Sequence, residues 1–195
     1  MEKFKANDNK NEEHEINYRQ FNKKLELLNQ ILSLISDINQ AADEKEVKDC
    51  IPALLQYIGE YTDADRVYIF ELISEKQDYY SNTFEWCREG IIPQIDNLIR
   101  ISAGSMPVWH EKFLRGETII IHDLEKIRET MPSEYDILKV QDIHSLLALP
   151  LFANTQLSGF IGLDNPDLAN PGVSISLLSN AGGHLASTLN NLRMF

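Results

Sequence analysis

The chain has 195 residues, of which 43% are hydrophobic and 25% are charged, a balance that suits one folded domain with a sizeable core and some additional helix. Its formal net charge of −12 disfavours a broad basic surface, so we expect no nucleic acid or anionic lipid among its partners. No apolar run approaches the roughly 20 residues that a membrane-spanning helix needs, and we expect a cytoplasmic chain without direct membrane contact.

The first 40 residues divide into two parts of different composition. Residues 1–16 are rich in Lys, Glu and Asn and are predicted to be disordered or to form a frayed helix start. Residues 17–40 are predicted to form an amphipathic signalling helix, because apolar side chains recur at alternating spacings of four and three. This seam consists of Phe21, Leu25, Leu28, Leu32 and Ile35. It can pack on its own domain, on a second copy of the chain, or on both.

Residues 41–195 are predicted to form one domain that begins and ends with a helix. Its expected strands are residues 66–74, 79–87, 117–121, 144–152 and 157–164. Its expected helices are residues 45–62, 109–114, 123–128, 133–141 and 174–195. A long irregular stretch, residues 88–115, precedes the third strand, and excursions of this length are often functional. Hairpin-joined strands bracketed by helices predict an α+β domain with an antiparallel sheet.

The last expected helix repeats the spacing of the first. Its seam is Leu178, Gly182, Leu185, Leu189 and Leu192. Two such seams at the ends of one domain predict a homodimer. The expected dimer interface consists of Phe21, Leu25, Leu28, Leu32, Ile35, Leu178, Leu185, Leu189 and Leu192. Because Phe195 falls within this helix, we expect the helix to continue into an output domain of a longer chain.

Five segments, in this order, resemble the GAF domains of bacterial signal-transduction proteins. The segments are ADRVYIFE, EWCREGIIPQIDNL, GETIIIHDLE, EYDILKVQDIHSLLALPLF and LSGFIGLDNP, and the resemblance covers about residues 40–190. It implies a sheet of five to six strands, with the terminal helices on one face and the roof of a small-molecule pocket on the other. It also implies a dimeric sensor whose helices act on a histidine kinase, a diguanylate cyclase of cyclic di-GMP signalling, or a phosphodiesterase.

Relatives with a known chemistry carry residues that this chain lacks. Reductases of free methionine sulfoxide need paired cysteines near the pocket, and residues 142–145 contain none. Bilin-binding relatives attach the chromophore through a cysteine in the long excursion, and residues 88–143 contain none. The Asn-Lys-Phe…Asp-Glu pattern of cyclic-nucleotide binders is also absent. Cys50 and Cys87 do not have the spacing of metal ligands, so we expect no metal. Because the residues of the known reductases and chromophore binders are missing as well, we expect no enzyme and no cofactor.

The predicted pocket combines aromatic side chains with a few polar ones, as small-molecule sites usually do. Strand alternation places Phe84 and Trp86 on one face of the second strand, and Trp109 lies in the expected roof. The predicted ligand-binding residues are Phe84, Trp86, Trp109, His110, Asp123 and His144. The run GFIGLDNP is interpreted as a strand ended by a turn, with a structural role.

The functional prediction is a non-catalytic sensory domain that binds an unidentified small molecule and signals through dimerising terminal helices. Two alternatives stay open. If the tryptophans merely fill the core, the chain is a ligand-free dimerisation module. If Cys50 and Cys87 react, the chain is a thiol redox enzyme, for which the sequence offers no positive sign.

Overall fold

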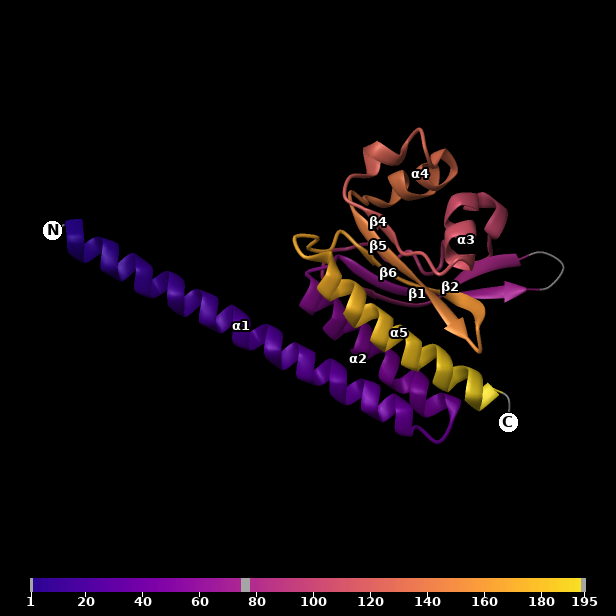
Figure 1. Cartoon of the computed structure of the whole chain (residues 1–195), viewed down its shortest axis with the longest axis horizontal. Coiled ribbons are helices and arrows are strands. Elements are labelled where there is room, and N and C mark those ends of the chain that lie inside the picture. Colours follow the sequence, from indigo (N-terminus) through magenta and orange to yellow (C-terminus); the bar gives the residue numbers. More distant parts are fainter. Residues whose placement is uncertain (1, 75–77, 194–195) are drawn as a thin grey trace.

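The computed structural model of the chain describes residues 2–74 and 78–193 (Figure 1). Its strands form one six-stranded antiparallel sheet in the order β3-β2-β1-β6-β5-β4. The strands are β1 (Arg66–Ser74), β2 (Asp78–Cys87), β3 (Ile101–Ser102), β4 (Ile119–Ile121), β5 (Leu146–Ala153) and β6 (Gln156–Asp164). The helices are α1 (Glu2–Gln40), α2 (Glu44–Thr62), α3 (Pro107–Leu114), α4 (Pro132–Leu138) and α5 (Pro171–Arg193), with short 3-10 helices η1 (Ala103–Ser105), η2 (Leu124–Ile127) and η3 (Lys139–Gln141). The expected α+β class is confirmed.

Strands β1 and β6 pair at the centre of the sheet and define its two faces. Tyr68 lies opposite Gly162, and Phe70 lies opposite Phe160. Successive side chains of a strand point to opposite faces. Phe160 is therefore buried on one face with Tyr68 and Phe70, whereas the next residue, Ile161, is buried on the other. Both faces of the two central strands are thus covered.

The coverings of the two faces come from different parts of the chain. Helices α2 and α5 lie on one face, and α1 packs on both helices from outside (Figure 1). The other face lies under residues 88–143, which contain α3 and α4 and which we call the roof. The expected arrangement, with terminal helices on one face and a roof on the other, is confirmed.

Helix α2 begins and ends at residues that suit helix termini. The Asp43 side chain accepts a hydrogen bond of 2.9 Å from the Glu46 backbone N–H, which satisfies one of the free donors of the first turn. Asp63, in the left-handed region with φ 55°, ends the helix. The face between these ends carries Val47, Ile51, Leu54, Leu55 and Ile58, all fully buried. The predicted second helix is therefore confirmed to within one residue at its start.

Helix α1 runs as one helix across residue 16 and extends beyond the rest of the domain (Figure 1). Its C-terminal part packs through Leu27, Ile31, Ile35 and Ile38, which are buried in the core under the helices. No helix in residues 2–74 and 78–193 is long and apolar enough to cross a membrane.

The two halves of the predicted dimer interface lie in different surroundings. On α1, the side chains of Phe21, Leu25 and Leu32 are 64%, 47% and 54% exposed. Leu28 is half-buried against the core, and Ile35 is buried in it.

On α5, the structure corrects the prediction. Leu178, Leu185 and Leu189 are buried against the domain's own sheet, and Leu192 packs beside them. An alternating spacing of four and three fits a helix on a sheet as well as a helix on a helix. Leu178, Leu185 and Leu189, together with Ile35 of α1, therefore belong to the core of one chain and are not free to meet a second copy, whereas Leu192 is only half-buried.

Candidate functional site

A small cavity lies between the sheet and the roof. Its aromatic walls are Tyr68, Phe70, Trp109 and Phe160, its aliphatic walls come mainly from the roof, and its polar walls are Glu85, Gln141 and Asp164. The cavity volume is about 30 Å³, which is room for a single water molecule. Ligand sites of ordinary size measure roughly 300–1,000 Å³. The cavity is therefore nearly filled by the side chains that line it.

Phe160 is the centre of the aromatic cluster. Its ring stacks on Phe70 at a centroid distance of 4.6 Å and on Phe113 at 5.0 Å. Tyr80 and Trp109 meet the same ring edge to face, at 5.2 and 6.1 Å. Stacked and edge-to-face pairs are the favoured aromatic geometries. Since Phe113 and Trp109 belong to α3, this cluster fixes the roof helix on the sheet.

A buried ion pair forms the polar end of the cavity. Arg66 Nε lies 2.9 Å from Asp164 Oδ2, and the two side chains are only 3% and 2% exposed. The Tyr68 hydroxyl donates a hydrogen bond of 2.9 Å to Asp164 Oδ1. Burial raises the pKa of Asp164 to about 6, although the Arg66 charge and the Tyr68 hydrogen bond act in the opposite direction. Desolvation is thus the dominant influence on this carboxyl group.

Arg66 also joins the sheet to two parts of the roof. Its guanidinium donates to the backbone oxygen of Gln141 at 2.7 Å and to that of Ile92 at 3.4 Å. Gln141 and Asp164 line the inner cavity, whereas Arg66, Ile92 and Gln141 line an outer cleft of about 190 Å³. The guanidinium therefore lies in the wall between the two spaces.

Glu85 is held by neutral donors. One of its oxygens accepts from the backbone N–H groups of Gln94 at 2.8 Å and Ile95 at 3.1 Å, and the other accepts from Asn82 Nδ2 at 3.1 Å. The Cys87 thiol lies 3.6 Å from the Glu85 carboxylate. Burial, assisted by the Glu85 charge, raises the pKa of Cys87 to about 12. The thiol is therefore protonated at neutral pH and unsuited to nucleophilic chemistry.

The start of α3 is held by a buried carboxylate. Glu134 Oε1 accepts from the backbone N–H groups of Val108 at 2.8 Å and Trp109 at 3.2 Å, at the first turn of α3. No side chain caps this helix from Met106, so Glu134 of α4 supplies the acceptor. The indole nitrogen of Trp109 is buried without a partner. The backbone of Trp109 is therefore held by Glu134, whereas its indole N–H has no hydrogen-bond acceptor among the described residues.

The structure separates the predicted ligand-binding residues into four places. Trp109 alone lines the cavity. His110 lies beside it on α3 and shares a hydrogen bond of 2.9 Å with the Tyr80 hydroxyl through Nδ1. Asp123 and His144 lie together in a groove on the outside of the roof, where His144 is exposed.

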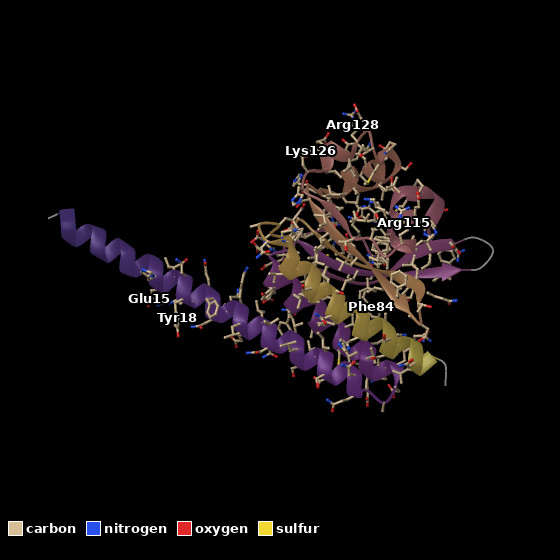
Figure 2. All side chains as sticks on the ribbon, in the orientation of Figure 1. Glu15, Tyr18, Phe84, Arg115, Lys126 and Arg128 are labelled. Atoms are coloured by element: carbon tan, nitrogen blue, oxygen red, sulfur yellow. The ribbon has the colours of Figure 1, made fainter. Side chains whose placement is uncertain are left out.

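Phe84 and Trp86 do not share the cavity, and their predicted grouping with Trp109 is wrong. Both pack on the face under the helices, where Trp86 lies against Gly59 of α2 (Figure 2 labels Phe84). The cause is a shift of register in the β1–β2 pairing, in which Ile69 lies opposite Phe84 but Phe70 lies opposite Asn82. The extra residue, Thr83, reverses the alternation, as a β-bulge does. Glu85 consequently takes the place on the cavity face.

Sequence reasoning also missed the residues that β1 and β6 contribute to the cavity. Tyr68, Phe70, Phe160 and Asp164 all line it. The signal was present in the alternation of RVYIFE and GFIGLD, which puts Tyr68 and Phe70 on one face of β1 and Phe160 and Asp164 on one face of β6. The run GFIGLDNP therefore forms a wall of the cavity in addition to its structural role. Metal binding has no counterpart in the described residues, where no group of three or more His, Cys, Asp or Glu side chains could hold an ion.

The solved structures of similar fold include GAF domains. A phycocyanobilin-bound GAF domain from a cyanobacterial phytochrome has a TM-score of 0.68 at 15% identity, covering 86% of this chain and 96% of that one. The photoproduct state of GAF3 from Slr1393 of Synechocystis sp. PCC6803 has a TM-score of 0.62 at 17% identity, covering 75% and 95%. These likenesses establish the fold.

A sequence relative is the methanogenesis regulatory histidine kinase FilI of Methanothrix harundinacea (strain 6Ac). It is 32% identical over 124 residues, which are 62% of this chain and 14% of the kinase. The chain thus spans a small part of that protein's length. The GAF domain family model matches residues 46–176, from the first turn of α2 to the first turns of α5. This match covers more than half of the sequence, and the chain belongs to the GAF domain family.

Proposed function

We propose that this GAF domain is a non-catalytic sensor that binds a small molecule in the cavity under the roof and signals through its terminal helices. The observation that carries the proposal is the double use of β1 and β6. On one face these strands supply Tyr68, Phe70 and Phe160 to the cavity site. On the other face they supply Ile69 and Ile161 to the core shared with α1, α2 and α5. A movement of β1 or β6 caused by a ligand in the cavity would therefore directly move the side chains that pack on α1, α2 and α5.

Ligand entry has to move the roof, because a space of about 30 Å³ does not admit an organic molecule. The parts that must move are fixed by Phe113 and Trp109 on Phe160, and by Arg66 on the Gln141 and Ile92 carbonyls. A ligand shifts the balance between closed and open roofs only by binding them with different affinity. Because the cavity under the closed roof has no room for an organic molecule, such a ligand would bind only the open form.

The ligand that we propose is smaller than a bilin and is not covalently attached. One of the similar solved structures is named for its bound phycocyanobilin, but residues 88–143 contain no cysteine, and the cavity lining contains none either. The closed cavity is also far below the volume of an ordinary ligand site.

The output route that we propose runs through α1 and a second copy of the chain. Phe21, Leu25 and Leu32 form an exposed apolar stripe on α1, and Tyr18 continues it along the protruding part (Figure 2). Below them, a groove of about 660 Å³ lies between α1 and α5 and is lined by Leu28, Leu32, Val173 and Leu177, among others. Apolar stripes of this kind mark association surfaces. The relationship to FilI supports a histidine kinase as the output domain.

Native mass spectrometry of the purified chain tests both parts of the proposal. We expect a dimer that retains a small molecule. Leu25→Asp should give a folded monomer, because a charge would be buried in the seam. Gln30→Asp, an exposed position elsewhere on α1, is the matched control and should stay dimeric.

Two results would contradict the proposal. A Leu25→Asp protein that stays dimeric would remove the α1 stripe from the interface. A dimer that carries no small molecule, and that gains none from a metabolite extract, would favour a ligand-free dimerisation module.

A further inference from the structure

The polar end of the cavity holds two carboxylates and one cation. Glu85 and Asp164 both line the cavity, and Asp164 is paired with the buried Arg66. The partners of Glu85 are two backbone N–H groups, the Asn82 amide and the Cys87 thiol, all neutral. Among the residues that line the cavity, none is Lys, Arg or His. One negative charge therefore lies at the cavity wall without a side-chain cation to balance it.

The positive charge of Arg66 is already used. Its guanidinium nitrogens contact Asp164, Gln141 and Ile92, and it lies toward the outer cleft. An anionic ligand in the inner cavity would meet Glu85 and Asp164 with no free cation opposite. Asp164 is buried and Glu85 is half-buried, and a further negative charge beside these two carboxylates is unfavourable because like charges repel.

The remaining walls suit a cation as well. Tyr68, Phe70, Trp109 and Phe160 surround the space with aromatic rings, whose faces attract organic cations. Trp109 adds a second, independent requirement. Trp109 is 3% exposed, and its indole N–H has no acceptor among the described residues. Buried donors of this kind normally have a partner.

Resting on the proposed sensory function, we propose that the ligand is a small organic cation, an ammonium or amidinium on a flat apolar body that also carries one hydrogen-bond acceptor. The cationic group faces Glu85 and Asp164, and the acceptor receives the Trp109 indole N–H. The apolar body lies among the aromatic rings once the roof has moved outward.

Three probes of one shape test the charge. They are para-methoxybenzylamine, para-methoxybenzyl alcohol and para-methoxybenzoate, which are cationic, neutral and anionic at pH 7 and share an ether oxygen as acceptor. Binding is measured by isothermal titration and by saturation-transfer NMR on the wild-type chain. It is measured also on Phe160→Leu, which enlarges the cavity without changing its charge. We expect the ammonium probe to bind about tenfold or more tightly than the alcohol, and the benzoate to bind least.

Two variants assign the preference to named groups. Glu85→Gln should reduce the preference for the ammonium over the alcohol to about threefold or less, because it removes the unbalanced charge. Glu89→Gln, an exposed carboxylate four residues further on, is the matched control and should leave the preference unchanged. Trp109→Phe should weaken para-methoxybenzylamine but not para-ethylbenzylamine, which has no ether oxygen.

The outcomes separate this inference from the proposed function. Alcohol or benzoate binding as tightly as the ammonium in the same cavity would overturn the cation assignment and leave a small-molecule sensor. A preference that survives Glu85→Gln would overturn it also. If none of the three probes binds either protein, the cation assignment is overturned, and the native mass spectrum then decides separately whether the chain binds a small molecule of another kind.

Discussion

The two faces of the sheet are built from the same strands but have different chemistry. The face under α2 and α5 is mainly aliphatic, with Ile69, Leu147 and Ile161 packed on helix leucines and isoleucines. The face under the roof carries the aromatic cluster around Phe160, the cavity, and the buried Arg66–Asp164 pair. Aliphatic packing fixes the position of helices, whereas aromatic walls with a few polar groups suit recognition. In the proposed sensor, recognition and transmission would therefore occupy opposite sides of one sheet.

The largest expected effect tests whether the roof face depends on its buried charges. Arg66→Met should lower the free energy of unfolding by about 3–5 kcal/mol, because Asp164 would remain buried without its cation. Urea denaturation measures the loss. Arg88→Met is the matched control: Arg88 is 40% exposed and pairs with Asp63 at 2.7 Å, so its loss should be within about 1 kcal/mol. Equal losses in the two variants would contradict the contrast between the faces.

The second effect concerns pH and belongs to the roof face alone. The folded chain binds the Asp164 proton more tightly than the unfolded chain, because the pKa of Asp164 is raised from 3.8 to about 6. The contribution of this group to stability therefore grows as the pH falls from about 6 to 4 and is lost as the pH rises through 6. Relative to Asp164→Asn, the wild type should gain about 2–3 kcal/mol between pH 7 and pH 4. Urea denaturation at the two pH values gives this difference, and parallel pH curves for the two proteins would refute the assignment.

The smallest expected effect tests the packing of the helix face. Gly59→Ala places a methyl group inside the Trp86 ring, and the resulting overpacking should cost about 1–3 kcal/mol. Gly183→Ala in α5 meets nothing within 4 Å and should stabilise the helix by up to about 1 kcal/mol. Thermal unfolding of both variants gives the sign directly. A stabilised Gly59→Ala protein would contradict this prediction, because it would mean that the Trp86 ring can move away from α2 without loss of stability.

Much of the fold could be predicted from local pattern. The span 66–74 matches β1, and the last hairpin was found because two apolar runs flank the polar Asn154 and Thr155. The two-residue strand β3 was missed, since it pairs only with Tyr79 and Tyr80 and has no periodicity of its own.

The site was harder to predict because it depends on register. A single extra residue at Thr83 moves Phe84 and Trp86 to the helix face and puts Glu85 at the cavity. Nothing in the local sequence announces that shift, because the bulge is a property of the pairing with β1. Trp109 was found because its place in the roof does not depend on strand register.

The protruding part of α1 turns small rotations into large displacements. Among residues 14–73, Leu27 is the first buried side chain, and residues 2–26 of α1 extend for roughly 37 Å at 1.5 Å per residue. A tilt of about 5° at the docked end therefore carries the far end through roughly 3 Å. In the proposed dimer, two such helices would act as levers that pivot where α1 packs on α2 and α5. A small movement of the sheet would then be enough to displace the N-terminal end of α1.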